Sequence, residues 1–371
     1  MGKEFVVVMR GPSAMLFDHN KQLRVQDFQS DVGPVNITYT TRYLNRGPEV
    51  IMPGDLWIDI RGSANSLGEA LEPFANAGLG MLPLLTLSSN SAIEDADIEL
   101  GFDNTSGLTE RDYFQNYIPP ESNVVHVGRR INIEATIALL RALGPHPDSE
   151  RLRRGANQYR LALLSWRLGR ETLSLAHLWM AVEAITKAKL RAECVAHGVI
   201  EQADLAAKMG VDLKQLDGVI RKELILKGDK ECYEKARKAS DGFEHGFLGY
   251  DKIRELSRDV RHRMADYVRV AILEMCGLDD NTFATLTSDP YDKPLGYWPV
   301  VKYLRGKLVG SGDELAAPGN AYPFIRWNPT IKSSKLNENG RIECQLNETL
   351  TVETAEGIGF QQQSLEVWQA G

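Results

Sequence analysis

Residues 236–278, ARKASDGFEHGFLGYDKIRELSRDVRHRMADYVRVAILEMCGL, decide how the centre of this chain folds. The stretch is rich in turn-forming residues over Asp241–Gly246, which predicts a loop there. After it, apolar residues recur at steps of three and four, the spacing of one face of an α-helix. These residues are Ile253, Leu256, Val260, Met264, Tyr267, Ala271 and Met275. We therefore predict a loop that ends in His245 and Gly246, followed by one long amphipathic helix.

An earlier segment, Leu173–Leu190, has the same character. Its apolar stripe consists of Leu175, Trp179, Val182 and Ile185. Helical patterns also run over Arg130–Leu143 and over the strongly basic Arg151–Leu168. Because helices with such stripes bury them against each other, the middle of the chain predicts an antiparallel helical bundle.

Two such helices on either side of a His-Gly step resemble the HEPN superfamily, in particular the Apea-like HEPN domains. The resemblance spans residues 150–278 and depends on the helix with Trp179 and Glu183, the His245–Gly246 step and the closing helix. It implies a homodimer that binds or cleaves RNA without a metal ion. A histidine would act as general acid/base, and an arginine a few residues before it would hold the phosphate.

His245 is the predicted acid/base, and the predicted phosphate ligands before it are Lys238 and Arg237. Lys238 has the spacing of the family pattern but lacks the planar fork of an arginine, whereas Arg237 lies one residue too far away. His262 is a second candidate, which the helical spacing places on the solvated face of the closing helix. We expect Glu183 to form a salt bridge with an arginine of that helix.

A second pattern, Asp204–Ile220, resembles a helix-turn-helix, with a small alanine and a turn glycine that let two helices cross closely. Two bundle helices joined by a tight turn explain the same pattern. The predicted nucleic-acid contacts are Lys214, Arg221, Lys222 and Arg258.

The N-terminal part predicts a β-sheet with a helix on one face. Strands are predicted over Glu4–Arg10, Val35–Tyr43, Asp55–Ile60, Met81–Ser88 and Asp97–Phe102. Ser66 and Glu69 form a capping box, which marks the start of a helix that ends at Gly78 or Gly80.

The C-terminal part predicts a small β element. Asn339–Gly340 is a hairpin turn signal between Ile331–Leu336 and Arg341–Leu346. Thr349–Glu353 and Ser364–Trp368 are further predicted strands, and the element as a whole is a candidate to complete the N-terminal sheet. The fold class is therefore α+β, in three parts: an α+β domain (1–128), a HEPN-like helical domain (129–285) and a C-terminal β-rich element (286–371).

Charge is distributed unevenly over these parts. Residues 1–128 carry 8 basic and 17 acidic side chains (−9), residues 129–285 carry 27 and 23 (+4), and the remainder carries 8 and 10 (−2). Only the helical part has the local positive surplus that phosphate contacts require. The four cysteines are scattered without metal-ligand spacing, so we expect reduced thiols, no metal and no cofactor.

No apolar run is long enough to span a bilayer, and the N-terminus lacks the layout of a signal peptide, so we expect a cytoplasmic protein without a membrane partner. The first functional hypothesis is a HEPN-type RNA-binding protein and metal-independent endoribonuclease of a bacterial defence or stress system. One alternative is a non-catalytic HEPN-like assembly or sensing protein, with a protein partner on the N-terminal domain. The other is a helix-turn-helix DNA-binding regulator.

Overall fold

The structure is a computed structural model that describes residues 3–45, 51–117, 128–297, 301–310, 324–336, 342–353 and 356–368. Two compact units can be distinguished. The first consists of Met1–Arg42, Asp55–Pro120 and Gly128–Tyr297, and contains a β-sheet and a layer of helices. The second consists of Tyr43–Gly54, Glu121–Val127 and Trp298–Gly371. The fold is α+β, as predicted from the sequence.

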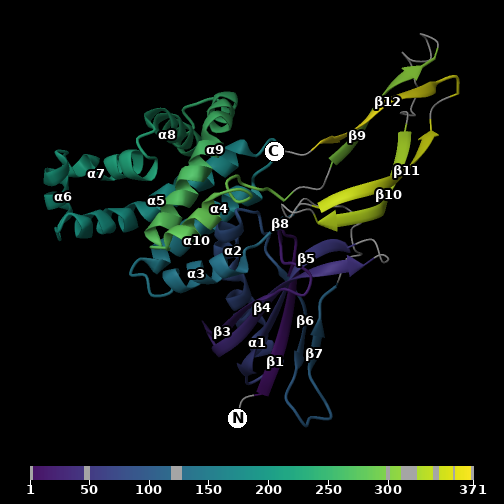
Figure 1. Cartoon of the computed structure of the whole chain (residues 1–371), viewed down its shortest axis with the longest axis horizontal. Coiled ribbons are helices and arrows are strands. Elements are labelled where there is room, and N and C mark those ends of the chain that lie inside the picture. Colours follow the sequence, from purple (N-terminus) through teal and green to yellow (C-terminus); the bar gives the residue numbers. More distant parts are fainter. Residues whose placement is uncertain are drawn as a thin grey trace. The chain divides into compact units, whose positions relative to one another are not determined.

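The first unit contains an antiparallel six-stranded sheet in the order β3-β4-β5-β1-β6-β7 (Figure 1). Its strands are β1 (Lys3–Gly11), β3 (Leu23–Ser30), β4 (Gly33–Asn45), β5 (Ile51–Ala64), β6 (Asp97–Asp103) and β7 (Tyr113–Gln115). β1 is central, and its Val7 lies between Ile60 of β5 and Gly101 of β6. A short parallel pair, β2 (Met15–Leu16) with β8 (Arg129–Arg130), lies outside this sheet. Four of the five predicted N-terminal strands are confirmed, as β1, β4, β5 and β6.

Helix α1 (Leu67–Leu79) packs on one face of the sheet, as predicted. The side chain of Ser66 accepts a hydrogen bond from the backbone N–H of Glu69 and so caps the helix start. A Cβ on Gly101 would lie 3.0 Å from the Leu71 side chain, so glycine at this position lets the helix approach the strand closely. Gly80 ends the helix.

The predicted strand Met81–Ser88 is wrong, because these residues form helix α2 (Leu82–Ser89). The segment is buried on nearly all sides, including its polar residues Thr86, Ser88 and Ser89, so its apolar residues do not form a single helical face. Pro83 near the helix start is the sequence signal that favours a helix, since proline is tolerated in the first turn.

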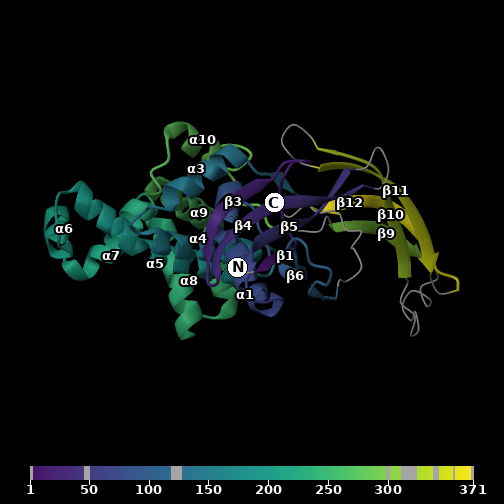
Figure 2. The same cartoon turned by 90° about the horizontal axis from the view of Figure 1, so that it is seen from below.

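The helical layer follows in the chain. Its helices are α3 (Ile133–Leu143), α4 (Ser149–Leu164), α5 (Glu171–Ala196), α6 (Gln202–Met209), α7 (Leu216–Val219), α8 (Lys230–His245), α9 (Tyr250–Met275) and α10 (Asp280–Thr287), with a 3-10 turn over Leu213–Gln215 and a π-helical turn over Ile220–Ile225. Helices α4, α5, α8 and α9 pack on one another, and the predicted apolar stripes of α5 and α9 lie in or against this core. In Figures 1 and 2, α6 and α7 lie at the end of this layer farthest from the sheet.

The predicted loop over Asp241–Gly246 is also wrong, because α8 continues to His245. Ala236, Ala239 and Gly242 are buried along one helical face, and a Cβ on Gly242 would lie 2.8 Å from the Leu248 side chain. The turn signal belongs to Gly246, which has a φ of 68° and caps the helix in the left-handed conformation. Only residues 246–249 connect α8 to α9.

Arg269 of α9 holds the helices and the α2 segment together. Its side chain is fully enclosed and donates hydrogen bonds to four backbone carbonyls, those of Leu87, Ser88, Leu286 and Tyr291. A buried guanidinium is stable there because these carbonyls satisfy its donors.

The second unit contains two antiparallel pairs, β10 (Phe324–Leu336) with β11 (Ile342–Glu353) and β12 (Gly359–Trp368) with β9 (Val301–Val309). The predicted C-terminal strands lie in these pairs, except that Thr349–Glu353 is not a separate strand but the continuation of β11. The predicted turn Asn339–Gly340 lies outside the described residues. Within the described ranges, these strands pair with each other and are not part of the six-stranded sheet.

Candidate nucleic-acid interface

Two turns meet at one end of the helical layer. Residues 165–170 connect α4 to α5, and residues 246–249 connect α8 to α9. Glu171, the first residue of α5, contacts Arg254 and Arg258 in the first turns of α9. The two turns therefore lie at the same end, and we refer to residues 165–172 and 243–262 together as the bundle end.

Glu171 is the anchor of the bundle end. It is buried, its Oε1 lies 3.1 Å from Nε of Arg258, and its Oε2 lies 3.7 Å from Nε of Arg254. Burial opposes ionisation of this carboxyl, but backbone N–H groups and Arg258 outweigh it and hold its pKa below the ordinary value. A negative charge at the first turn of α5 is also favoured by the helix dipole.

Trp166 contacts two further side chains of α9. The guanidinium of Arg261 lies 4.8 Å from the centre of the Trp166 ring, and the ring of His262 meets Trp166 edge-on at 4.9 Å between centroids. Burial, with the charge of Arg261, lowers the pKa of His262, so its imidazole is neutral near pH 7. Trp166 contacts the ring of His262, but the residue as a whole is still solvent-exposed, as predicted.

Buried donors without partners are concentrated at the bundle end. In the described part of the chain, ten buried side-chain polar atoms lack a hydrogen-bond partner, and six of them belong to residues 166, 167, 171, 172, 254 and 261. Four of the six are donors, on Trp166, Arg167, Arg254 and Arg261. Such an arrangement suits an anion that accepts several hydrogen bonds at once.

The charges of the bundle end also favour an anion. The bundle end carries six basic side chains, at positions 167, 170, 252, 254, 258 and 261, and five acidic ones, at positions 171, 244, 251, 255 and 259, so it has a surplus of one positive charge. A groove of about 790 Å³ continues from Arg254 and Arg258 to Lys235 of α8. Three acids line it: Asp259 is paired with Lys235, Glu255 is paired with Lys252, and Asp251 is the third, so the two arginines carry the positive charge of the groove.

Exposed aromatic side chains surround the turn between α8 and α9. Phe243, Phe247 and Tyr250 are 50%, 59% and 58% exposed. Aromatic rings that face solvent beside a cationic surface are typical of sites where unpaired bases stack.

The predicted catalytic residues are placed on α8. His245 is the last residue of the helix and is exposed, and Lys238 lies seven residues earlier on the same helical face. Seven residues correspond to a rise of about 10 Å along the axis, so the structure does not bring these two groups into contact. Arg237 is turned toward acids, with Nη2 at 3.1 Å from Glu234 and Nη1 at 3.9 Å from Asp241.

The predicted helix-turn-helix residues are not gathered on one exposed face. Lys214 is exposed, but Arg221 lies over Trp179 and donates to Thr186 and Glu183. The predicted partner of Glu183 is therefore corrected: it is Arg221 of the π-helical turn, not an arginine of α9. Lys222 lies 3.0 Å from Glu223. Of the four predicted nucleic-acid contacts, Arg258 alone belongs to the bundle end.

Sequence reasoning missed the residues that surround Arg258. Trp166 and Glu171 come from the α4–α5 turn, whereas Arg254 and Arg261 come from α9. A recognisable signal exists only on α9, where arginines recur at positions 254, 258 and 261 with helical spacing. The contribution of the α4–α5 turn depends on tertiary packing.

Within the described residues, no helix is both long and apolar enough to cross a membrane, and no group of three metal-ligating side chains occurs. No family model, curated protein or solved structure matches this chain.

Proposed function

We propose that this protein binds single-stranded RNA at the bundle end. The observation that carries the proposal is the cluster of arginines 167, 254, 258 and 261 around Glu171, where four buried donors lack a hydrogen-bond partner and Arg254 and Arg258 are ion-paired with Glu171. A phosphate accepts hydrogen bonds from several guanidinium groups at once, and each such bond is stronger than one between neutral groups. The groove that leads from Arg254 and Arg258 to Lys235 has room for a longer ligand, and Lys235 itself is paired with Glu231 and Asp259.

The aromatic side chains favour a single strand over a duplex. Phe243, Phe247 and Tyr250 offer exposed rings beside the arginines, and rings of this kind stack on bases that are not paired. In a double helix the bases are already stacked, so these three side chains would contribute nothing to its binding.

A second proposal is metal-independent cleavage of the bound RNA, with His262 as the general base. His262 is exposed, its pKa is lowered, and Arg258 and Arg261 precede it on the same helix. The neutral imidazole would take the proton of a ribose 2′-OH, and the resulting oxygen would attack the adjacent phosphorus. The bond to the 5′ oxygen breaks, that oxygen is protonated by solvent, and the products are a 2′,3′-cyclic phosphate and a 5′-OH end.

The experiment uses the full chain and a fluorescently labelled single-stranded RNA in a buffer that contains EDTA. Binding is measured by fluorescence anisotropy, and cleavage by gel electrophoresis. The variants are Arg258→Gln, His262→Ala and His245→Ala. We expect Arg258→Gln to weaken binding about tenfold, the loss of one charge-assisted contact, and both histidine variants to bind normally.

The outcomes separate the hypotheses. Loss of cleavage in His262→Ala alone supports His262 as the base, whereas loss in His245→Ala alone supports the site that the HEPN resemblance implies. Binding without any cleavage supports an RNA-binding protein that is not an enzyme. If the wild-type chain does not bind RNA, or if Arg258→Gln binds as well as wild type, the bundle end is not an RNA site and the assembly or sensing alternative is favoured.

A further inference from the structure

A hollow of about 500 Å³ lies over β3, β4 and β5 on the face of the six-stranded sheet that α1 does not cover. The covered face is identified by Tyr39 of β4, whose hydroxyl donates a hydrogen bond to the backbone carbonyl of Gly78 in α1. Ile58 of β5 lies on the same face, because a Cβ on Gly78 would be 3.3 Å from its side chain. Since side chains alternate along a strand, Thr38 and Trp57 belong to the opposite face, and both line the hollow.

The charged groups of the hollow are paired with one another or with an amide. Nε and Nη2 of Arg61 donate to the two carboxylate oxygens of Asp59, at 2.7 and 3.0 Å. Nε of Arg24 donates to the side-chain oxygen of Gln22 at 2.8 Å. An ionic ligand would therefore have to compete with partners that these guanidinium groups already have.

The uncharged polar groups of the hollow have hydrogen-bonding capacity to spare. The side chains of Gln26, Thr38 and Thr40 form no hydrogen bond with any residue that the structure describes. Asn36 uses its side-chain oxygen to accept from the backbone N–H of Asp27, and its amide NH₂ remains available. Hydroxyls and amides both donate and accept, which matches a ligand whose own groups do the same.

Trp57 adds an aromatic surface to these polar groups. It is partly buried, and the guanidinium of Arg42 lies 5.6 Å from the centre of its ring, where it restricts the orientation of the ring. An aromatic ring is negative on its faces, so it attracts the C–H groups of a sugar ring, which carry a small positive charge. Hydroxyls around such a sugar would reach the amide and threonine side chains.

The charge of this part of the chain separates a carbohydrate from a nucleic acid. An RNA strand could also place a base on Trp57, but residues 1–128 carry a net charge of −9. The field of so many acids repels a polyanion and leaves the binding of an uncharged sugar unaffected. The observations therefore favour a neutral ligand.

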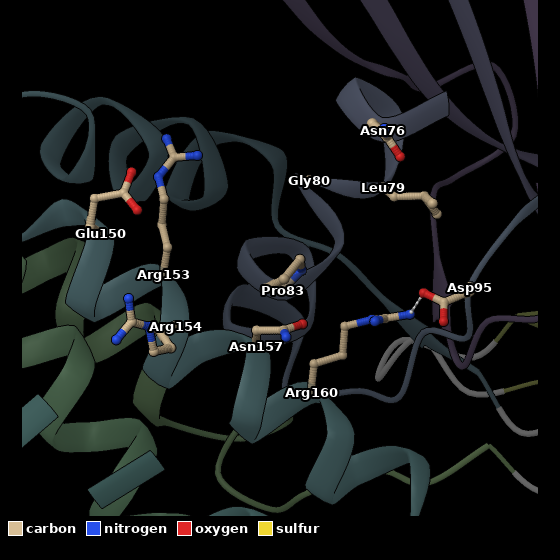
Figure 3. A pocket seen from close by; sticks show the side chains of 10 residues that line it. All are labelled: Asn76, Leu79, Gly80, Pro83, Asp95, Glu150, Arg153, Arg154, Asn157 and Arg160. Carbon is tan, nitrogen blue, oxygen red and sulfur yellow. Dashed lines mark hydrogen bonds and ion pairs between the residues drawn. The ribbon is translucent and has the colours of Figure 1, made fainter. Parts of the chain in front are cut away.

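A second hollow, between α1 and α4, lacks such convergence. Figure 3 shows Arg153 and Arg154 pointing apart, and Arg160 is turned to Asp95, with Nη2 at 2.7 Å from its carboxylate. These three cations do not share one ligand position, and we assign no ligand to them.

We propose that the hollow over β3, β4 and β5 binds an uncharged oligosaccharide, with one sugar ring on Trp57 and its hydroxyls on Gln26, Asn36 and Thr38. The site is separate from the bundle end and does not depend on the proposed function.

The test exposes the labelled full chain to an array of immobilised oligosaccharides that are uncharged, sialylated or sulfated. An uncharged oligosaccharide that is captured is then titrated calorimetrically against the wild-type chain and three variants. Trp57→Ala should weaken binding about tenfold or more, and Thr38→Val, which removes a hydroxyl at nearly constant volume, about fivefold. Gln115→Ala is the control and should bind normally, because Gln115 is an exposed amide on β7 of the same sheet, outside the hollow.

The proposal is overturned if no uncharged oligosaccharide binds at about 1 mM, or if charged ones bind more tightly. It is equally overturned if neither Trp57→Ala nor Thr38→Val weakens binding, or if Gln115→Ala weakens it as much as they do. Loss of RNA binding in Trp57→Ala without any sugar binding would make the hollow a nucleic-acid contact instead. Thr38→Val keeps the test decisive even if Trp57→Ala does not fold.

Discussion

The salt dependence of RNA binding should change when arginines of the bundle end are replaced. We choose the double variant Arg258→Gln/Arg261→Gln. Glutamine keeps a donor for Glu171 and can cover Trp166, so the replacement removes two positive charges with little loss of packing.

The magnitude follows from counterion release. Each phosphate that a cation neutralises on a single strand contributes a slope of about −0.7 to the logarithm of affinity against the logarithm of salt concentration. If the four arginines at positions 167, 254, 258 and 261 each neutralise one phosphate, the wild-type chain should have a slope of about −2.8, and the double variant should retain about half of it. At low salt, the loss of two charge-assisted contacts should weaken binding about 100-fold.

The assay is fluorescence anisotropy with a short labelled RNA over a series of salt concentrations. Arg191→Gln is the matched control, because Arg191 is half-exposed on α5 and contacts Asp148 at the other end of the bundle. Circular dichroism confirms that each variant is folded. An unchanged slope in the double variant, or an equal loss in Arg191→Gln, would refute the assignment of phosphate contacts to the bundle end.

Three predictions concern stability. Arg269→Met should lower the free energy of unfolding by about 3–5 kcal/mol in urea titrations, because four buried carbonyls lose their donor; a loss under 1 kcal/mol would contradict the role of this side chain. Gly155→Ala should lower the free energy of unfolding by about 1–2 kcal/mol, because the new Cβ would lie 2.5 Å from Cγ2 of Ile185 and this overpacking outweighs the gain in helix propensity. A variant as stable as the wild type, or more stable, would contradict the close packing of α4 on α5. Because the pKa of Glu171 is lowered, its stabilisation is present above the ordinary glutamate pKa of about 4.3 and disappears as the pH falls through the lowered value. Thermal melts from pH 6 to pH 2.5 should therefore show a smaller acid-induced loss in Glu171→Gln, and parallel curves for the two proteins would contradict this.

Much of the fold could be predicted from local sequence, and the failures have identifiable causes. Strand β1 and the capping box at Ser66 follow from alternation and capping, which are local properties. The segment 82–89 is buried on nearly all sides, so its apolar residues carry no period that distinguishes a helix from a strand. The last turn of α8 was predicted as a loop because of Gly242, but this glycine allows close contact with Leu248 and does not form a turn.

The bundle end could be predicted only in part. Arg258 and the exposure of His262 follow from the spacing of α9. Glu171 and its partner Arg258 are 87 positions apart in the sequence, and no local pattern indicates a contact at such a separation. The sequence likewise could not show that Arg237 and Arg221 pair with acidic residues of the protein itself. An arginine binds a carboxylate and a phosphate equally readily, so the residue type alone does not tell which partner it has.

The most direct test of the central claim is to locate bound RNA on the protein. A single-stranded RNA that contains 4-thiouridine is crosslinked to the wild-type chain with ultraviolet light, and the crosslinked peptides are identified by mass spectrometry. The account predicts crosslinks in residues 243–250, where Phe243, Phe247 and Tyr250 are exposed, and at the α4–α5 turn. Crosslinks confined to residues 204–222 or to the β-sheet would contradict it.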